Sequence, residues 1–232
     1  MKLSETTITV MKNFSEIQKN LAVSPGNTLR TISDGNNIIA QAKVPEQFET
    51  PFSIFEITRF LGVLSLFNDP DISFHEKEMS IECDSNTVKY VYAEPSILKT
   101  PPEKNIELPS VDLDFVIREK DLNSVLRAAR VMSLPDLTVR SDGKGAISIV
   151  AHDKKDRSNG EYAAEIDSSD ITESVAATVD FKVDKLKFIQ CDYRLRISSK
   201  KISQFDATGL DEGTELELTY WVAAETTSKF ES

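Results

Sequence analysis

The chain has 232 residues, of which 40% are hydrophobic and 8% aromatic, so it can fill a sizeable core and is not a disordered segment. Asp and Glu number 38 against 27 Lys and Arg, a net charge of −11, which disfavours nucleic acid unless the basic residues gather on one surface. The longest apolar stretch, 60–67, is far shorter than the roughly 20 residues of a membrane span, and the polar start is atypical of a secretory signal.

The first half of the chain predicts two helices and five strands. Apolar residues recur at helical spacing in 4–21, where Ser4 can cap the helix, and in 55–67. Alternating segments bounded by turn-forming residues predict the strands 28–32, 38–44, 72–75, 79–83 and 88–93.

The segment 94–110 holds four of the nine prolines and predicts an extended linker. After it the pattern restarts with a strand at 111–117, a helix at 118–132, two strands, and a short helix at 180–190 followed by three strands. The same order of elements occurs twice, so we expect an α+β fold of two similar, mostly antiparallel domains, 1–108 and 111–232. A single mixed domain is the alternative.

Each predicted helix carries basic residues opposite its apolar face. Arg127 and Arg130, three residues apart, share one helical stripe. Acidic residues concentrate in loops, strands and the linker. Four basic helices in an acidic chain indicate an anionic partner, although an ordinary solvated face remains the alternative for each helix. The candidates are Lys12, Lys19, Arg59, Arg118, Lys120, Arg127, Arg130, Lys182, Lys185 and Lys187.

Several segments, taken in order, resemble the DNA sliding clamps of T4-like bacteriophages. They are MKLSETTITVMKNF at the start, FLGVLSLFNDPDIS at 60–73, VLRAAR at 125–130 before a strand–DGKG–strand pair, and YWVAAETTS at 220–228. The resemblance covers essentially the whole chain. No single segment is an active-site signature.

The resemblance implies the DNA-clamp fold, with two domains per subunit, each with two helices packed on antiparallel sheet. Three subunits would join head to tail into a ring around duplex DNA and tether the replicative polymerase, conferring processivity without enzymatic activity or a cofactor. It further implies a phage DNA polymerase, an ATP-dependent clamp loader and late-transcription factors as partners, in the cytoplasm of the infected bacterial host.

The resemblance also assigns residues. The ten basic candidates would line the hole and contact DNA without reading bases, although Arg118 could instead pair with a neighbouring acid. Partner peptides would dock in an apolar pocket near the linker. Its candidate lining is Ile97, Leu98, Leu108 and Val222, for which ordinary linker packing is the alternative.

Catalytic and metal-binding motifs are missing from the sequence: there is no P-loop, HExxH, CxxC or GxSxG. We expect Cys83 and Cys191 to be small core residues. We expect His75 and His152 to be ordinary histidines at a surface or strand edge. The pairs Asp69/Asp71 and Asp112/Asp114 have a spacing that can hold a metal on a strand, but turn and solvated-strand roles are favoured. A phage structural or assembly protein that binds protein rather than DNA is the main alternative function, and a hydrolase the third.

Overall fold

The computed structural model describes residues 1–104, 106–208 and 216–231, which divide into two compact units. The first unit comprises Met1–Glu103 with Glu212–Leu218, and the second Lys104–Asp211 with Thr219–Ser232. None of the helices in the described part of the chain combines the length and hydrophobicity that a membrane-spanning helix requires.

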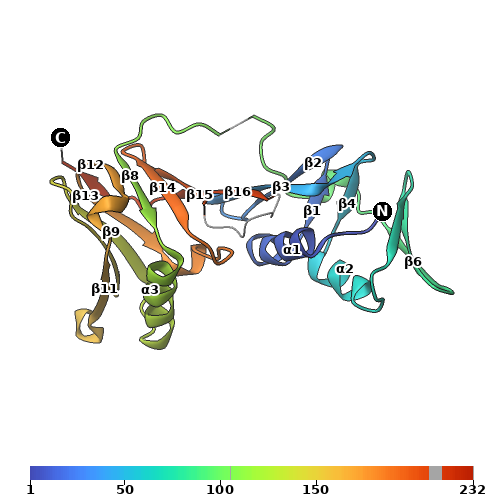
Figure 1. The fold of residues 1–232 in the computed structure, drawn as a ribbon, viewed down its shortest axis with the longest axis horizontal. Coiled ribbons are helices and arrows are strands. Elements are labelled where there is room, and N and C mark those ends of the chain that lie inside the picture. The colour runs from blue at the N-terminus through green and yellow to red at the C-terminus, as the bar shows by residue number, and fades with distance from the viewer. Residues whose placement is uncertain (105, 209–215, 232) are drawn as a thin grey trace. The chain divides into compact units, whose positions relative to one another are not determined.

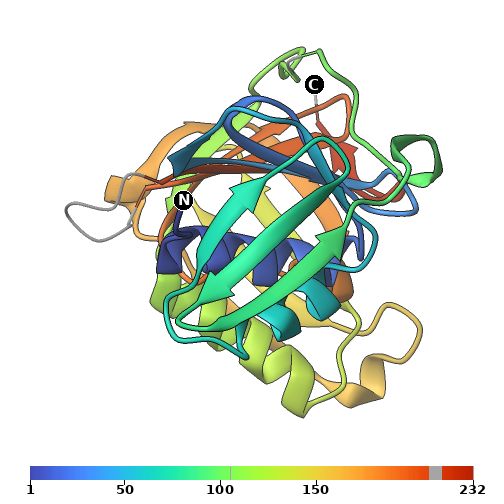
Figure 2. The same ribbon diagram turned by 90° about the vertical axis from the view of Figure 1, so that its right-hand side faces the viewer.

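Two helices, two small antiparallel sheets and one further antiparallel pair of strands form most of the first unit. The helices α1 (Glu5–Ile17) and α2 (Ile57–Leu64) lie side by side (Figure 2). Ser4 caps α1 by accepting a hydrogen bond from the Thr7 backbone N–H at 3.2 Å, as the sequence predicts. The strands are β1 (Leu21–Val23) paired with β4 (Phe52–Ile54), β2 (Gly26–Ile32) paired with β3 (Ile38–Phe48), and β5 (Asp71–Phe74), β6 (Glu78–Cys83) and β7 (Asn86–Val91) in that order.

The second unit contains one α-helix among its described residues, α3 (Glu119–Val131), packed against β10 and β11 (Figure 1). One antiparallel sheet has the order β11 (Glu161–Glu165), β10 (Ile147–His152), β9 (Asp136–Asp142), β13 (Ala176–Lys182) and β17 (Lys229–Phe230). A further sheet contains, in order, β12 (Ile171–Ser174), β8 (Leu113–Ile117), β14 (Tyr193–Ser198), β15 (Ile202–Ala207) and β16 (Glu217–Ala223). Short 3₁₀ turns η1 (Pro95–Ile97), η2 (Arg157–Asn159), η3 (Ser168–Asp170) and η4 (Val183–Lys185) complete the elements.

The helix predicted for 180–190 is wrong. The strand β13 runs on to Lys182, η4 makes one tight turn, and 186–192 has no regular secondary structure. The Tyr193 hydroxyl donates to the Ile189 carbonyl at 2.5 Å, and the Ile189 N–H donates to the Tyr220 hydroxyl at 3.3 Å. The Ile189 N–H, which would bond within a helix, instead donates to a residue 31 positions away, so a tertiary contact overrides a weak helical pattern.

Aromatic packing fixes the same irregular segment. The Phe188 ring stacks on Tyr220 with centroids 4.4 Å apart and contacts Phe205 at 4.7 Å. Tyr193 and Tyr220 are fully buried. The segment is therefore part of the core of the second unit, although it lacks a helix.

Candidate nucleic-acid interface

The first unit presents three of the predicted basic residues on or next to its helices. Val10 and Phe14 bury the core-facing side of α1, while Lys12 points to solvent. Lys19 lies just beyond the end of α1, with its Nζ 5.5 Å from the centroid of the Phe55 ring. Arg59 is exposed on α2. Lys12 and Arg59 therefore remain available to a ligand, whereas the Lys19 ammonium already rests on an aromatic face.

The clearest basic surface of the second unit lies on α3. Leu122, Val125 and Ala129 are buried on one side of this helix, as the sequence predicts. Arg127 and Arg130 lie on the outer side, are exposed, and form no ion pair with any residue that the structure describes. Their guanidinium groups are thus available to an external anion.

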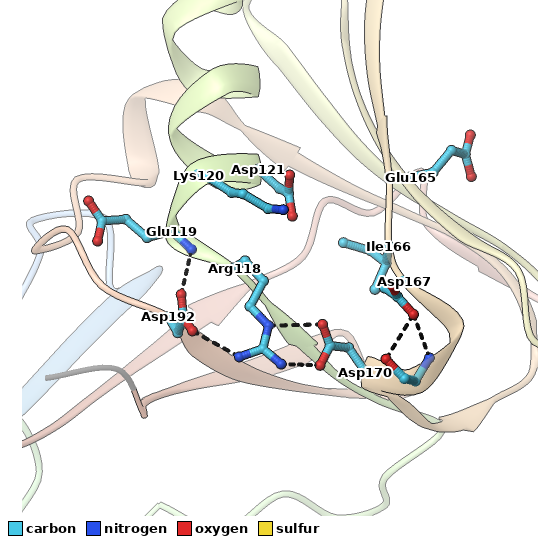
Figure 3. A pocket seen from close by; sticks show the side chains of 10 residues that line it. Arg118, Glu119, Lys120, Asp121, Glu165, Ile166, Asp167, Asp170 and Asp192 are labelled. Carbon is cyan, nitrogen blue, oxygen red and sulfur yellow. Dashed lines mark hydrogen bonds and ion pairs between the residues drawn. The ribbon is translucent and has the colours of Figure 1, made fainter.

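Arg118 is held by neighbouring acids, as Figure 3 shows. It is the residue directly before α3, and its Nε donates to Asp170 Oδ2 at 2.9 Å while Nη1 donates to Asp192 Oδ2 at 3.0 Å. Asp192 also accepts from the Glu119 backbone N–H at 2.7 Å. The hydrogen bonds that Arg118 donates to Asp170 and Asp192 raise the pKa of Arg118, so this side chain organises the start of α3.

The cavity around Arg118, about 810 Å³, is strongly acidic. Lys120, another of the predicted DNA contacts, shares it with Arg118. The remaining charged lining residues are all acidic: Glu119, Asp121, Glu165, Asp167, Asp170 and Asp192. A phosphate would be repelled here, so the basic surface of α3 is confined to its middle and C-terminal turns.

The lysines of the expected fourth helix do not form a helical stripe. Lys182 ends β13 and its Nζ donates to Asp136 Oδ1, while the Nζ of Lys185 donates to Glu225 Oε1 at 2.6 Å. Both lysines are partly buried, and Lys187 is exposed. Instead of a helical stripe, the structure shows one largely apolar cavity of about 470 Å³ that is lined by three of the predicted basic residues, Arg130, Lys182 and Lys187.

Lys182 belongs to a buried charged network in the second unit. Asp136 is 1% exposed. Its burial favours a raised pKa, but bonds from the Lys182 ammonium and the Lys154 backbone N–H hold the Asp136 pKa below its usual value. Asp180, 3% exposed, behaves the same way: burial is outweighed by Lys154 and two threonine hydroxyls, and its pKa is lowered. Sequence reasoning missed Lys154, because nothing local marks it as the partner of a buried acid.

The four predicted peptide-pocket residues differ widely in exposure. In the first unit Ile97 is 63% exposed and Leu98 is buried; in the second Leu108 is partly exposed and Val222 is fully buried in β16. Ile97 lines a groove of about 570 Å³ with Phe55 and residues of β7. Of the four, Ile97 is the side chain with a large surface to offer a partner.

Both carboxylate pairs are engaged in structural contacts: Asp69 pairs with Lys2, and Asp71 with the N-terminal amine. Asp112 accepts from the Ser110 hydroxyl at 2.6 Å and the Ser199 N–H at 2.7 Å, and Asp114 binds Arg194 through two bonds of 2.8 and 2.6 Å. Within the described ranges, no group of three or more His, Cys, Asp or Glu side chains is arranged to hold a metal ion.

Comparison with known proteins supports the resemblance to sliding clamps that the sequence segments indicate. No family model matches the chain. The sliding clamp of Vibrio phage KVP40 is 29% identical over 231 residues, covering 97% of this chain and 99% of the relative. The sliding clamps of Escherichia phage RB69 and Enterobacteria phage T4 are each 28% identical over 64% of this chain and 66% of their own length. The chain is a homologue of the sliding clamps of T4-like phages.

Solved structures agree on the fold of this sliding-clamp homologue. The A. fulgidus PCNA bound to the C-terminal region of FEN-1 superposes with a TM-score of 0.73 at 16% identity, covering 99% of this chain and 100% of that one. A PCNA2–PCNA3 complex from Sulfolobus tokodaii gives a TM-score of 0.70 at 12% identity, covering 97% and 99%. The predicted α+β DNA-clamp fold is therefore confirmed, with one expected helix replaced by η4 and an irregular segment.

Proposed function

We propose that this sliding-clamp homologue encircles duplex DNA as a ring of three subunits and tethers a replicative DNA polymerase. The observation that carries the proposal is the pair Arg127 and Arg130, exposed on α3 without an ion-pair partner among the described residues. The chain has a net charge of −11, yet these two arginines share one helix face without an acidic partner among the described residues. This arrangement favours a surface that binds a polyanion over an ordinary solvated helix face.

The same features suit sliding better than tight binding. Arginine and lysine side chains attract phosphates without reading bases, so contacts of this kind favour no particular register on the duplex. A closed ring stays on DNA by topology, and weak contacts are then sufficient. The acidic cavity around Arg118 and Lys120 would discourage DNA from settling at the start of α3.

Tethering follows from the ring. A polymerase bound to it remains at high effective concentration near the primer end, and this raises processivity without chemistry by the clamp itself. We assign the exposed apolar side chain of Ile97 as one anchor for partner peptides. An ATP-dependent clamp loader and the late-transcription machinery of the phage are the further partners that we propose, in the host cytoplasm.

Ring assembly requires two unlike surfaces on each subunit. In the first unit, β7 is an outer strand of its sheet with Val91 69% exposed, whereas the other outer strand, β5, is bonded to the N-terminal residue through Ile72 N–H and the Met1 carbonyl at 2.7 Å. In the second unit, β11 is an outer strand with Tyr162 38% exposed. We assign β7 of one subunit and β11 of the next as the strands that join, since unpaired strand edges readily pair with another chain.

The decisive test compares linear with circular primed DNA. The clamp is loaded with a phage clamp loader and ATP, and the DNA-bound fraction is followed after the loader is removed. We expect retention on the circle and rapid loss from linear DNA with free ends. Equal retention on both would contradict encirclement, and equal retention that also disappears with moderate salt would indicate ordinary surface binding.

A further inference from the structure

In the turn between β10 and β11 the two acids are hydrogen-bonded to groups of the turn itself, while two of the bases are exposed without an ion pair among the described residues. Asp153 Oδ1 accepts from the backbone N–H groups of Lys155 at 2.8 Å and Asp156 at 3.2 Å. Asp156 Oδ1 accepts from the backbone N–H of Ser158 at 3.0 Å and from its hydroxyl at 2.6 Å. Both carboxylates are therefore bound by the turn itself, which fixes its conformation.

The cations of this turn have a different environment. Lys154 is bonded to Asp180 and to the Thr227 hydroxyl. Lys155 and Arg157 are exposed, and neither side chain has an ion-pair partner within the described ranges. Two unpaired cations are thus presented by a turn whose acidic groups are already bound by N–H and O–H donors.

The turn stands beside the C-terminal end of α3. A Cβ at Gly160 would lie 3.6 Å from Met132 Cε, and Met132 directly follows the last residue of α3. Gly160 has φ +74°, a conformation that glycine adopts at little cost and that lets the turn fold back to β11. Figure 1 shows the turn (gold) and the end of α3 (yellow-green) projecting from the same side of the second unit.

The α3 C-terminus also suits cations. The last turn of a helix carries partial negative charge, so bases nearby are stabilised and do not have to pair with acids. Arg130 already lies in that turn of α3. On the helical wheel Arg130 lies to one side of the exposed face of α3, and Met132, with the turn against it, lies to the other. The exposed stripe that bears Arg127 therefore has Arg130 on one side and, on the other, the turn that carries Lys155 and Arg157.

We propose that the β10–β11 turn is a second element that contacts the phosphodiester backbone of the encircled duplex, through Lys155 and Arg157. The inference rests on the proposed function, because it needs DNA to lie over the outer face of α3. The contact is independent of base sequence, since flexible cations on a turn reach phosphate oxygens and not groove edges. Sequence reasoning passed over this segment because it is polar and irregular and has no helical stripe.

The test uses the full-length clamp loaded on nicked circular DNA. A photo-crosslinking amino acid is placed at Arg157, with Arg127 as the positive position and Lys229 as the negative one. Lys229 is exposed on β17, at the opposite edge of the sheet from β11 and roughly 19 Å away at about 4.8 Å per strand. We expect DNA crosslinks from positions 127 and 157 and none from 229.

A charge-removal variant supplies the second measurement. The plot of log affinity for duplex DNA against log salt has a negative slope, and each phosphate that a cation neutralises adds about 0.9 to its steepness. Lys155→Ala with Arg157→Ala should therefore make the slope shallower by about 1.8. The matched control is Lys200→Ala with Lys229→Ala, which removes the same charge from two exposed positions of the second unit without ion pairs among the described residues. It should leave the slope unchanged.

The outcomes separate the two proposals. If the wild-type clamp is not retained on circular DNA, the proposed function fails. If it is retained and position 127 crosslinks while position 157 does not, or if the turn variant keeps the wild-type slope, only the role of the β10–β11 turn is overturned.

Discussion

Arg118 grips the Asp170 carboxylate through both of its oxygens, with Nε 2.9 Å from Oδ2 and Nη2 bonded to Oδ1. This fork geometry holds the start of α3 against η3 and leaves the guanidinium little capacity for another anion. We expect Arg118→Ala to lower the thermal unfolding midpoint while it changes retention on circular DNA less than changes at Arg127 and Arg130. Strong loss of retention with an unchanged midpoint would show that Arg118 contacts DNA instead.

Reversing the charge of Arg127 and Arg130 should shorten the residence of the clamp on circular DNA and slow its loading. Both side chains are exposed and unpaired within the described residues, so folding and trimer mass should stay as in the wild type. The measurement is the DNA-bound fraction with time for Arg127→Glu with Arg130→Glu. Lys200→Glu with Lys229→Glu carries the same change in net charge and should behave like wild type. Residence equal in both variants would remove the two arginines from the proposed role.

Replacing Val91 on β7 should weaken the ring. Its side chain is 69% exposed, and a carboxylate buried at a strand-to-strand interface would be desolvated without a partner. We expect Val91→Asp to shift the mass from about three times 25.9 kDa towards that of one chain. Val131→Asp is the matched control, because Val131 is 79% exposed on α3, an element of the second unit that is not one of the proposed joining strands. A Val91→Asp protein that remains trimeric at micromolar concentration would exclude β7 from the interface.

The Asp136–Lys182 pair should make stability depend on pH in the acid range. The pKa of Asp136 is lowered in the folded state, so its contribution is complete above the unfolded value of about 3.9 and is lost as the pH falls through the folded value. At pH 7, Asp136→Asn should cost about 1–3 kcal/mol of unfolding free energy, because Lys182 loses its charged partner.

Urea unfolding at pH 7, 5 and 3 measures the gap in unfolding free energy between wild type and Asp136→Asn. We expect the same gap in free energy at pH 7 and 5 and a smaller one at pH 3. A gap that is constant down to pH 3 would mean that the Asp136 carboxylate does not owe its stabilising effect to its charge. DNA retention at pH 7 is the companion measurement, and it should be preserved as long as the variant is folded.

Tyr193 should anchor the irregular segment that replaces the expected helix. Its hydroxyl donates to the Ile189 carbonyl at 2.5 Å. Tyr193→Phe keeps the ring and removes this bond, which should cost about 1 kcal/mol and speed amide hydrogen exchange in 186–191. The control Tyr162→Phe changes a hydroxyl on an exposed ring and should leave both stability and exchange unchanged. Unchanged exchange in Tyr193→Phe would show that ring packing alone fixes the segment.

Most of the secondary structure could be predicted from local patterns. Ser4 and the apolar spacing after it define α1, and the Leu122–Ala129 face defines α3, because helix capping and amphipathic periodicity are properties of neighbouring residues. The clamp-like segments were readable for the same reason, whereas the repeated order of elements holds only in part, because the described residues of the second unit contain α3 and no second α-helix. The absence of a helix at 180–190 could not be predicted, since it depends on packing against Tyr220, a residue 31 positions beyond Ile189 in the sequence.

The sequence by itself determined the amphipathic helices, the alternating strands and the presence of exposed bases in an acidic chain, because each depends on residues a few positions apart. Only the tertiary structure decided which bases are free to bind an anion. Arg118 and Lys182 meet Asp170 and Asp136, acids 52 and 46 residues away in the sequence, while Arg127 and Arg130 meet no acid among the described residues. Ion pairing depends on distances of a few ångströms in space, which a linear pattern of charges does not record.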